Sequence, residues 1–201
     1  MARPGTFERV YAAIKEQLKR GIFRPGDRLE PAVLSERLNA SVTPVRDALH
    51  RLTGERLVEA PRHEGFRVPL LTESTLRHLY GWHHDLLLLA IMGHGELETA
   101  ALRIVNLSEG ETRLKHTSLF SEIVQSTGNP EHLLALQGLN ERLEPFRRLE
   151  PELLDALEEE AEDIVSALRA HDRKRLRRAL VRYHRRRSKL VPKLIDRSYQ
   201  E

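Results

Sequence analysis

Hydrophobic residues recur at every third or fourth position near the start of the chain, which is the spacing of one face of an α-helix. The first such set is Phe7, Val10, Ile14 and Leu18. It predicts a helix over residues 7–20, with Thr6 as the N-cap residue and Gly21 directly after the helix. The turn signal Pro25-Gly26-Asp27 separates this helix from the next hydrophobic set.

Two shorter helical patterns follow, each with a proline in its first turn, where the missing N–H is tolerated. Pro31 begins the first of them, which ends near Asn39. Ser41 or Thr43 caps the second, and Pro44 lies in its first turn. Its inward-facing residues are Val45, Ala48, Leu49 and Leu52, and its outward-facing residues are Arg46, Asp47, His50 and Arg51. Two short helices joined by a tight turn predict a helix-turn-helix.

Two strand-like runs, residues 57–60 and 66–69, come next, and residues 61–65 join them as a hairpin. Together with the three helices they predict a winged helix-turn-helix. In that module the second helix of the turn lies in the major groove of DNA, and a basic hairpin tip reaches the minor groove or the backbone. The alternative is a winged-helix module used only for protein contacts.

The rest of the chain has helical spacing throughout and no β pattern. The expected helices cover residues 72–92, 96–105, 108–127, 131–148, 151–170 and 173–194. We therefore expect a mainly α protein, with a winged helix-turn-helix in residues 1–71 and an all-α helical bundle in residues 72–201.

Composition narrows the class of protein. The longest apolar run, Leu86 to Met92, is seven residues, whereas a membrane span needs about 20. The chain has no cysteine, which excludes a disulfide scaffold and a cysteine nucleophile and fits a reducing compartment. The first ten residues contain no apolar segment of a secretory signal. We expect a soluble cytoplasmic protein with no membrane contact.

Charge is unevenly distributed. Residues 1–72 carry 13 basic and 9 acidic side chains, and residues 73–201 carry 20 and 21. Within the second part, residues 150–163 hold eight acidic residues and no basic one, and residues 173–189 hold ten basic residues and no acidic one. These runs are either solvated helix faces that pair with each other or with a partner chain, or, for the basic run, a surface that contacts nucleic acid.

Residues 21–68 resemble the GntR family of bacterial transcription regulators. The resemblance rests on Gly21-Ile22-Phe23-Arg24-Pro25-Gly26-Asp27-Arg28-Leu29, Leu34-Ser35-Glu36-Arg37-Leu38, Ser41-Val42-Thr43-Pro44-Val45-Arg46-Asp47-Ala48-Leu49, Gly54-Glu55-Arg56-Leu57-Val58 and Gly65-Phe66-Arg67-Val68. It implies a repressor or activator that binds double-stranded DNA as a homodimer on a short palindromic operator.

The resemblance also implies roles for individual residues. Arg46 matches an arginine that contacts bases and phosphate, and Ser41 and Thr43 match hydroxyls that bind phosphate. Val42 and Ala32 stand where family members have further arginines, so we expect a different or softer sequence preference, with Val42 placed to pack on a thymine methyl group. The expected DNA-contacting residues are Arg28, Ser41, Val42, Thr43, Pro44, Arg46, Arg51, Arg62, His63 and Gly65.

The second part resembles, over residues 119–129, 164–172 and 179–180, the FCD-type ligand domain of the FadR-like GntR subgroup. Many such domains bind a divalent metal through one aspartate and three histidines. The matching positions here are His116, Phe120, Ala161 and Tyr183, which do not form that ligand set. We expect no metal and no cofactor. Instead, these four residues with His83 are expected to outline a pocket for a small organic effector; the alternative is plain bundle core.

A neighbouring run, Trp82-His83-His84-Asp85, looks like a metal or base cluster, but adjacent residues on a helix point in different directions. We expect a surface or interface role for it. The chain contains no G-x-S-x-G, no H-E-x-x-H and no glycine-rich phosphate loop, so we expect no enzyme and no catalytic residue. The alternative function is a chromosome-associated protein that binds DNA without sequence preference.

Overall fold

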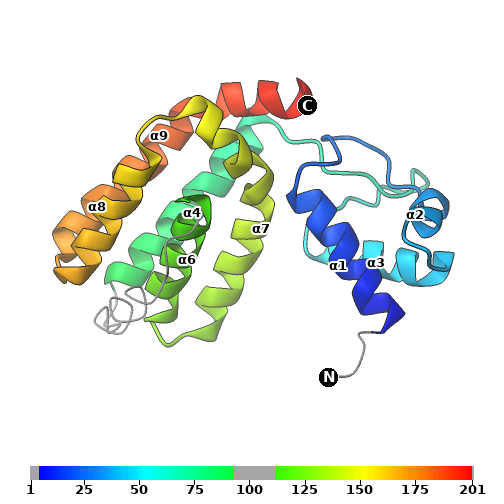
Figure 1. Ribbon diagram of the computed structural model, residues 1–201, viewed down its shortest axis with the longest axis horizontal. Coiled ribbons are helices and arrows are strands. Elements are labelled where there is room, and N and C mark those ends of the chain that lie inside the picture. The colour runs from blue at the N-terminus through cyan, green and yellow to red at the C-terminus, as the bar shows by residue number, and fades with distance from the viewer. Residues whose placement is uncertain (1–4, 93–111, 201) are drawn as a thin grey trace. The chain divides into compact units, whose positions relative to one another are not determined.

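The computed structural model describes residues 5–92 and 112–200, with the side chains of 112–115 left undescribed. The chain folds as two compact units (Figure 1). The first contains the N-terminal part through Thr72 together with the last residues from Asp196, and the second spans Glu73–Ile195. Which unit binds DNA and which binds an effector stays a prediction at this point.

Three helices make up the first unit: α1 (Thr6–Lys19), α2 (Pro31–Arg37) and α3 (Val42–Gly54). α1 and α2 both pack on α3. Their hydrophobic faces close one core, as the spacing in the sequence predicts, with the buried residues Val10, Ile14, Leu18, Leu29, Leu34, Val45, Ala48, Leu49, Leu52, Leu57 and Val58.

Gly21 ends α1 as its position predicts. Its φ of 71° is favourable only for glycine, and its N–H donates to the Leu18 carbonyl at 3.1 Å. The next N–H, of Ile22, donates to the Gln17 carbonyl at 3.1 Å, which completes a Schellman motif. At the other end the prediction is wrong by one residue, because Gly5 is the N-cap and Thr6 already lies in the helix.

The two strand-like runs do not form strands in the described part of the chain. Arg67 makes two isolated antiparallel bridges, one with Arg28 and one with Glu59. Pro61 and Pro69 lie at the ends of the runs, and neither has an N–H to donate to a ladder. The wing is therefore an irregular hairpin that is fastened at Arg67.

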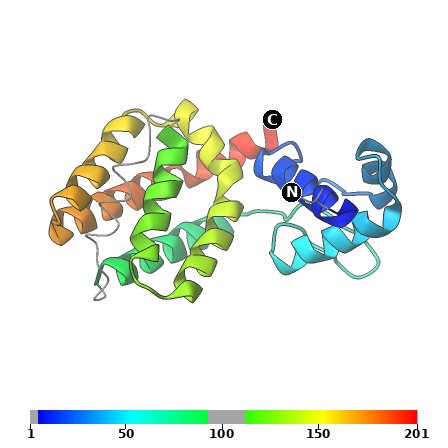
Figure 2. The same ribbon diagram turned by 60° about the horizontal axis from the view of Figure 1, so that its bottom comes forward.

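The second unit is a helical bundle of α4 (Glu73–Met92), α6 (Thr112–Gln125), α7 (Pro130–Leu153), α8 (Leu157–Arg169) and α9 (Arg173–Gln200) as far as Ile195. α4, α6 and α7 pack on one another, and α8 packs on α6 (Figure 2). These helices confirm the expected fold class. None of the described helices is long and apolar enough to cross a membrane.

Two predicted boundaries in this unit are wrong. Pro151 does not begin a helix: α7 continues through Pro145 and Pro151 to Leu153. The buried side chains of Leu149 and Glu150 hold this last part of α7 against the bundle, so tertiary packing overrides the local preference of proline for a first turn. α9 also continues to Gln200, beyond the expected end near residue 194. The helix expected over residues 96–105 and the start of the one expected from residue 108 lie outside the described residues.

Candidate nucleic-acid interface and effector pocket

A tight turn joins α2 to α3. Asn39 takes a φ of 48° directly after α2, and the N–H of Ala40 donates to the Ser35 carbonyl at 3.0 Å. Ser41 is the N-cap residue of α3, and its side chain makes no capping hydrogen bond. The first amides of α3 and the Ser41 hydroxyl are thus left for another partner. Backbone amides at a helix N-terminus are suited to bind phosphate.

The outer face of α3 is exposed along its first two turns. Ser41, Val42, Thr43 and Arg46 are exposed, and Pro44 is half-buried beside them. Val42 has 37% of its surface accessible although it is apolar. Within the described residues, the Arg46 side chain makes no hydrogen bond or ion pair. A long cation, two hydroxyls and an apolar group thus share one exposed turn.

Arg51 lies one and a half turns further along α3 and is engaged within the unit. Its guanidinium lies 4.2 Å from the centre of the Tyr11 ring, and its Nε lies 3.4 Å from Glu55 Oε1. Glu55 also accepts hydrogen bonds from Tyr11 and Lys15 at 2.6 and 2.9 Å. These contacts tie α3 to α1 and fix the direction of α3 in the unit.

The wing tip carries the other residues predicted to contact DNA. Arg62, His63 and Gly65 are exposed. His63 and Gly65 have φ values of 63° and 76°, which turn the chain back sharply. At the base of the wing, Arg67 forms ion pairs with Glu59 at 3.2 Å and with Glu64 at 3.1 Å.

His50 connects the wing to α3. Its ring meets the Phe66 ring edge-on, with 4.9 Å between centroids. The sequence identified His50 only as an outward-facing residue of α3. Its contact with Phe66 shows that this outward face also holds the wing in place. Arg28 lies exposed at the bridge with Arg67.

A polar network is buried in the second unit. His83 of α4 is fully buried, and its Nδ1 lies 2.8 Å from Nε2 of His184 on α9. Arg147 of α7 donates from Nη2 to His83 Nε2 at 2.9 Å and from Nη1 to Asn140 Oδ1 at 2.8 Å. His184 Nδ1 donates to the Leu180 carbonyl at 2.7 Å.

These contacts determine the state of both imidazoles. Since His184 Nδ1 carries the proton that is donated to Leu180, its Nε2 accepts from His83 Nδ1, and His83 Nε2 accepts from Arg147. Both histidines are therefore neutral. Burial, followed by the charge of Arg147, holds the pKa of His83 well below 6.5. Burial also lowers the pKa of His184 to about 3.

A second buried network is centred on Arg187 of α9. Its guanidinium is 2.9 Å from Glu150 Oε2 and 2.6 Å from Glu160 Oε2. It also stacks over the Tyr183 ring, 3.4 Å from the centroid. Tyr80 donates its hydroxyl to Glu150 at 3.2 Å. These contacts fasten α4, α7, α8 and α9 to one another.

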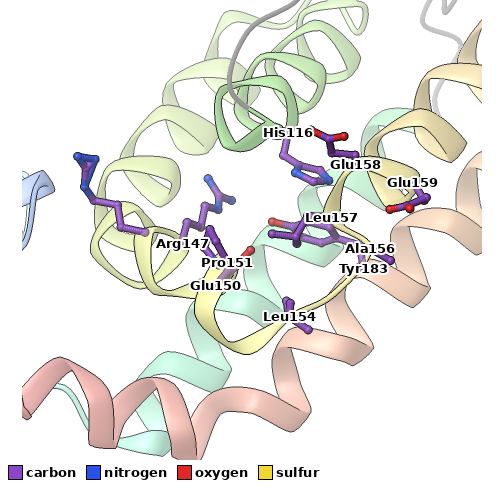
Figure 3. Close-up of a pocket in the computed structure, with 11 residues that line it drawn as sticks. His116, Arg147, Glu150, Pro151, Leu154, Ala156, Leu157, Glu158, Glu159 and Tyr183 are labelled. Atoms are coloured by element: carbon purple, nitrogen blue, oxygen red, sulfur yellow. The ribbon is translucent and has the colours of Figure 1, made fainter.

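A cavity of about 850 Å³ lies beside the two networks (Figure 3). Its lining residues are His116, Arg147, Arg148, Glu150, Pro151, Leu154, Ala156, Leu157, Glu158, Glu159 and Tyr183. His116, Leu157 and Tyr183 lie close together in Figure 3, with Arg147 and Glu150 reaching in from α7. Within the described residues, the Tyr183 hydroxyl and Arg147 Nε are buried without a hydrogen-bond partner. Burial raises the pKa of Tyr183.

Only some of the residues expected around the pocket line this cavity. His116 and Tyr183 do, whereas His83, Phe120 and Ala161 are buried and do not line it. The Phe120 ring packs between the rings of Tyr183 and His83, with centroid separations of 4.9 and 5.0 Å. Of the run Trp82-His83-His84-Asp85, for which a surface or interface role was expected, His83 is instead buried in the bundle core.

Sequence reasoning missed three residues of this region. Arg147 and Glu150 lie on the buried face of α7 with Leu136, Leu139 and Leu143. The signal available in the sequence was a charged residue at a core position of this helix. His184 on α9 is buried, with its ring 5.0 Å from that of Tyr183, and no sequence pattern assigned it a role. Phe120 and Ala161 offer no metal ligand, and within the described residues no three His, Asp or Glu side chains are grouped to hold an ion.

Comparisons with known proteins agree with the winged helix-turn-helix geometry. Residues 6–68 match the model of the bacterial regulatory proteins of the gntR family. This segment is therefore similar to the gntR family. The HTH-type transcriptional repressor GlaR of Escherichia coli (strain K12) is 34% identical over 70 residues, which cover 35% of this chain and 32% of GlaR.

Similarity to one transcriptional regulator extends beyond that segment. The Nta operon transcriptional regulator of Aminobacter aminovorans is 30% identical over 133 residues, or 60% of this chain and 63% of that protein. The chain thus matches between about a third and just under two thirds of the length of these relatives. The structure of E. coli McbR/YncC shares the fold, with a TM-score of 0.72 and 22% identity over 95% of this chain and 99% of McbR.

Proposed function

We propose that this chain is a sequence-specific DNA-binding transcriptional regulator that acts as a homodimer on a palindromic operator. The observation that carries the proposal is the exposed first turn of α3 within the gntR-matching segment, with the Arg46 side chain making no hydrogen bond or ion pair in the described part of the chain. Two copies bound to successive major grooves read the two halves of a palindrome. The chain acts in the cytoplasm and is not an enzyme.

Each predicted contact residue has a place in this proposal. The Ser41 and Thr43 hydroxyls and the first amides of α3 bind phosphate, next to Pro44. Arg46 reads a base edge, and Val42 packs on a thymine methyl group. On the wing, Arg62, His63 and the Gly65 backbone follow the minor groove. Arg28 and Arg51 contact the DNA backbone. Arg51 does so through the edge of its guanidinium that the Tyr11 ring does not cover.

The second unit holds a small organic effector without a metal. The supporting observations are the size of the cavity, about 850 Å³, and the two buried polar groups on its wall, the Tyr183 hydroxyl and Arg147 Nε. Ligand sites of proteins commonly enclose about 300–1,000 Å³. The effector shifts the population between DNA-competent and incompetent arrangements of the dimer. The FadR-like subgroup and an FCD-type second domain are part of the same proposal.

Selection of bound fragments from genomic DNA near physiological salt tests the proposal, with wild type and Arg46→Ala compared in parallel. We expect the wild type to recover a palindrome and the variant to lose it. Broad, salt-sensitive binding that is the same in both proteins would contradict sequence-specific recognition and favour the chromosome-associated alternative.

A further inference from the structure

The cations of α9 divide between two faces of the helix. On one face, Arg175, Arg186 and Arg187 pair with carboxylates of the acidic run. Arg175 lies 3.0 Å from Asp163, Arg186 lies 3.1 Å from Glu160, and Arg187 lies 2.6 Å from Glu160. Through these pairs, Glu160 and Asp163 of the acidic run help to hold α9 in the bundle.

The other face of α9 carries a row of cations at helical spacing, which we name the basic stripe. Its members are the cations Lys174, Arg177, Arg178, Arg182 and Arg185, with the apolar Val181 between them. They line a shallow groove of about 660 Å³, and no acidic residue of the described chain lines it. Arg182 also pairs with Asp163. The side chains of Lys174, Arg177, Arg178 and Arg185 make no hydrogen bond or ion pair with any described residue.

Such a row is unfavourable for the protein by itself. Lys174 and Arg178, and Arg178 and Arg182, are four residues apart on one helix face, and like charges at this spacing repel each other. A partner with regularly spaced negative charges removes the repulsion. From residue 174 to residue 185 the stripe extends about 16 Å, and a DNA strand places a phosphate about every 3.4 Å along the helix axis.

The composition of the stripe favours DNA over a protein partner. The centres of protein–protein interfaces are depleted in charged residues and enriched in aromatic ones. The basic stripe has no aromatic residue, and its only apolar member is Val181, which is 40% exposed. Residues 6–68 of the same chain match the gntR family. Under the proposed function this segment binds duplex DNA, which is a polyanion.

We propose that the basic stripe is a second DNA-contacting surface, which binds backbone phosphates without reading sequence. This inference rests on the proposed function, because the gntR-type domain delivers the chain to DNA. The stripe adds affinity for any duplex and leaves the choice of sequence to α3 and the wing.

The salt dependence of binding tests this surface in the full-length chain. The affinity for a short duplex of scrambled sequence is measured over a range of salt concentrations for wild type and for the triple variant Arg177→Ala/Arg178→Ala/Arg185→Ala. The slope of log K against log salt is negative, and each lost phosphate contact makes it shallower by about 0.9. We therefore expect the magnitude of the slope to decrease by about 2.7 per protomer. The affinity for an operator should fall by the same factor as that for the scrambled duplex.

Two variants serve as controls. The triple variant Arg177→Lys/Arg178→Lys/Arg185→Lys keeps the charges and should keep the slope. Arg169→Ala removes an exposed cation of α8 that pairs with Glu162 and lies off the stripe, and it should leave the slope unchanged. Helix content by circular dichroism establishes that all variants are folded.

The outcomes separate this inference from the proposed function. An unchanged slope in the alanine triple, with binding that still depends on Arg46, would overturn the second surface and leave the regulator intact. A wild type that does not prefer any sequence would overturn the regulator itself. If the alanine triple dissociates the homodimer in sedimentation equilibrium and leaves the slope unchanged, the stripe binds a second copy of the chain, and the DNA assignment is wrong.

Discussion

His83 and His184 meet in the core of the second unit with 2.8 Å between Nδ1 of the first and Nε2 of the second. One chain of hydrogen bonds runs from Arg147 through both imidazoles to the Leu180 carbonyl. Each ring donates once and accepts once, so the arrangement requires both to be neutral. A proton added to either ring would place two donors face to face beside the Arg147 charge.

We expect the second unit to lose stability as the pH falls below about 6.5. The folded state keeps both histidines neutral, with the pKa of His184 at about 3 and that of His83 well below 6.5. The unfolded chain protonates them with ordinary pKa values, so it binds more protons below that pH. The unfolding free energy then decreases by up to about 1.4 kcal/mol per pH unit for each histidine.

Urea unfolding followed by the fluorescence of Trp82, the only tryptophan, reports on this unit. The pH dependence between about pH 5.5 and 7 should shrink in His83→Gln and in His184→Gln. His78→Gln, at an exposed position of α4, should keep the wild-type dependence. An unfolding free energy that is constant over this range in the wild type would mean that the buried pair is not held neutral.

The ion pairs of Arg187 should make Glu150 one of the most sensitive positions in the chain. Glu150→Ala leaves the fully buried Arg187 with only Glu160 as a charge partner. Breaking a buried pair in this way destabilises a protein by about 3–5 kcal/mol. The control Glu159→Ala removes an exposed carboxylate of α8 and should change the unfolding free energy by less than about 0.5 kcal/mol. Equal effects of the two changes in urea unfolding would contradict the network.

Two tyrosines of the bundle should respond in opposite ways to loss of the hydroxyl. Tyr80 donates to Glu150 at 3.2 Å, so Tyr80→Phe should lower the unfolding free energy by about 1.5–3 kcal/mol. The Tyr183 hydroxyl has no partner among the described residues, so Tyr183→Phe should leave stability unchanged or raise it. If an effector binds in the cavity, Tyr183→Phe should weaken its binding. A Tyr183→Phe protein as unstable as Tyr80→Phe would show that the hydroxyl is satisfied inside the fold.

Val42 provides a direct test of base reading by α3. Val42→Arg places a guanidinium on the exposed first turn, and a good arginine–base pair contributes about 1–3 kcal/mol of discrimination. We expect site selection with this variant to recover a sequence changed at one position of each half-site. The control Val33→Arg adds the same charge to the exposed face of α2 and should leave the selected sequence unchanged. An unchanged sequence with Val42→Arg would mean that residue 42 reads nothing.

The three helices of the first unit could be predicted from the sequence because their signals are local. Gly21 after α1 and Pro31 at the start of α2 each act within a few residues, and both lie where the pattern places them. The same dependence on local signals explains why the two strand-like runs were wrongly predicted to form strands. Their composition is β-like, but two prolines remove the donors that a ladder requires, and the two isolated bridges of the described residues both involve Arg67.

The buried networks could not be predicted because their partners are far apart in the chain. His83 and His184 are separated by 101 positions, and Arg187 and Glu150 by 37. Helical spacing indicates that such residues face inward, but not which residue each one meets. The same holds for the continuation of α7 through Pro151, which depends on the packing of Leu149 and Glu150 and not on the local sequence.

The most direct test of the central claim is the ratio of two dissociation constants, one for the operator recovered by selection and one for a scrambled duplex of equal length, at the same salt concentration. We expect the wild type to prefer the operator by a factor of at least about 1,000. Arg46→Ala should reduce this preference by roughly 10-fold to 100-fold for each half-site, because each protomer of the dimer loses one base contact. A wild-type ratio near one, or a ratio that Arg46→Ala leaves unchanged, would contradict recognition of sequence by α3.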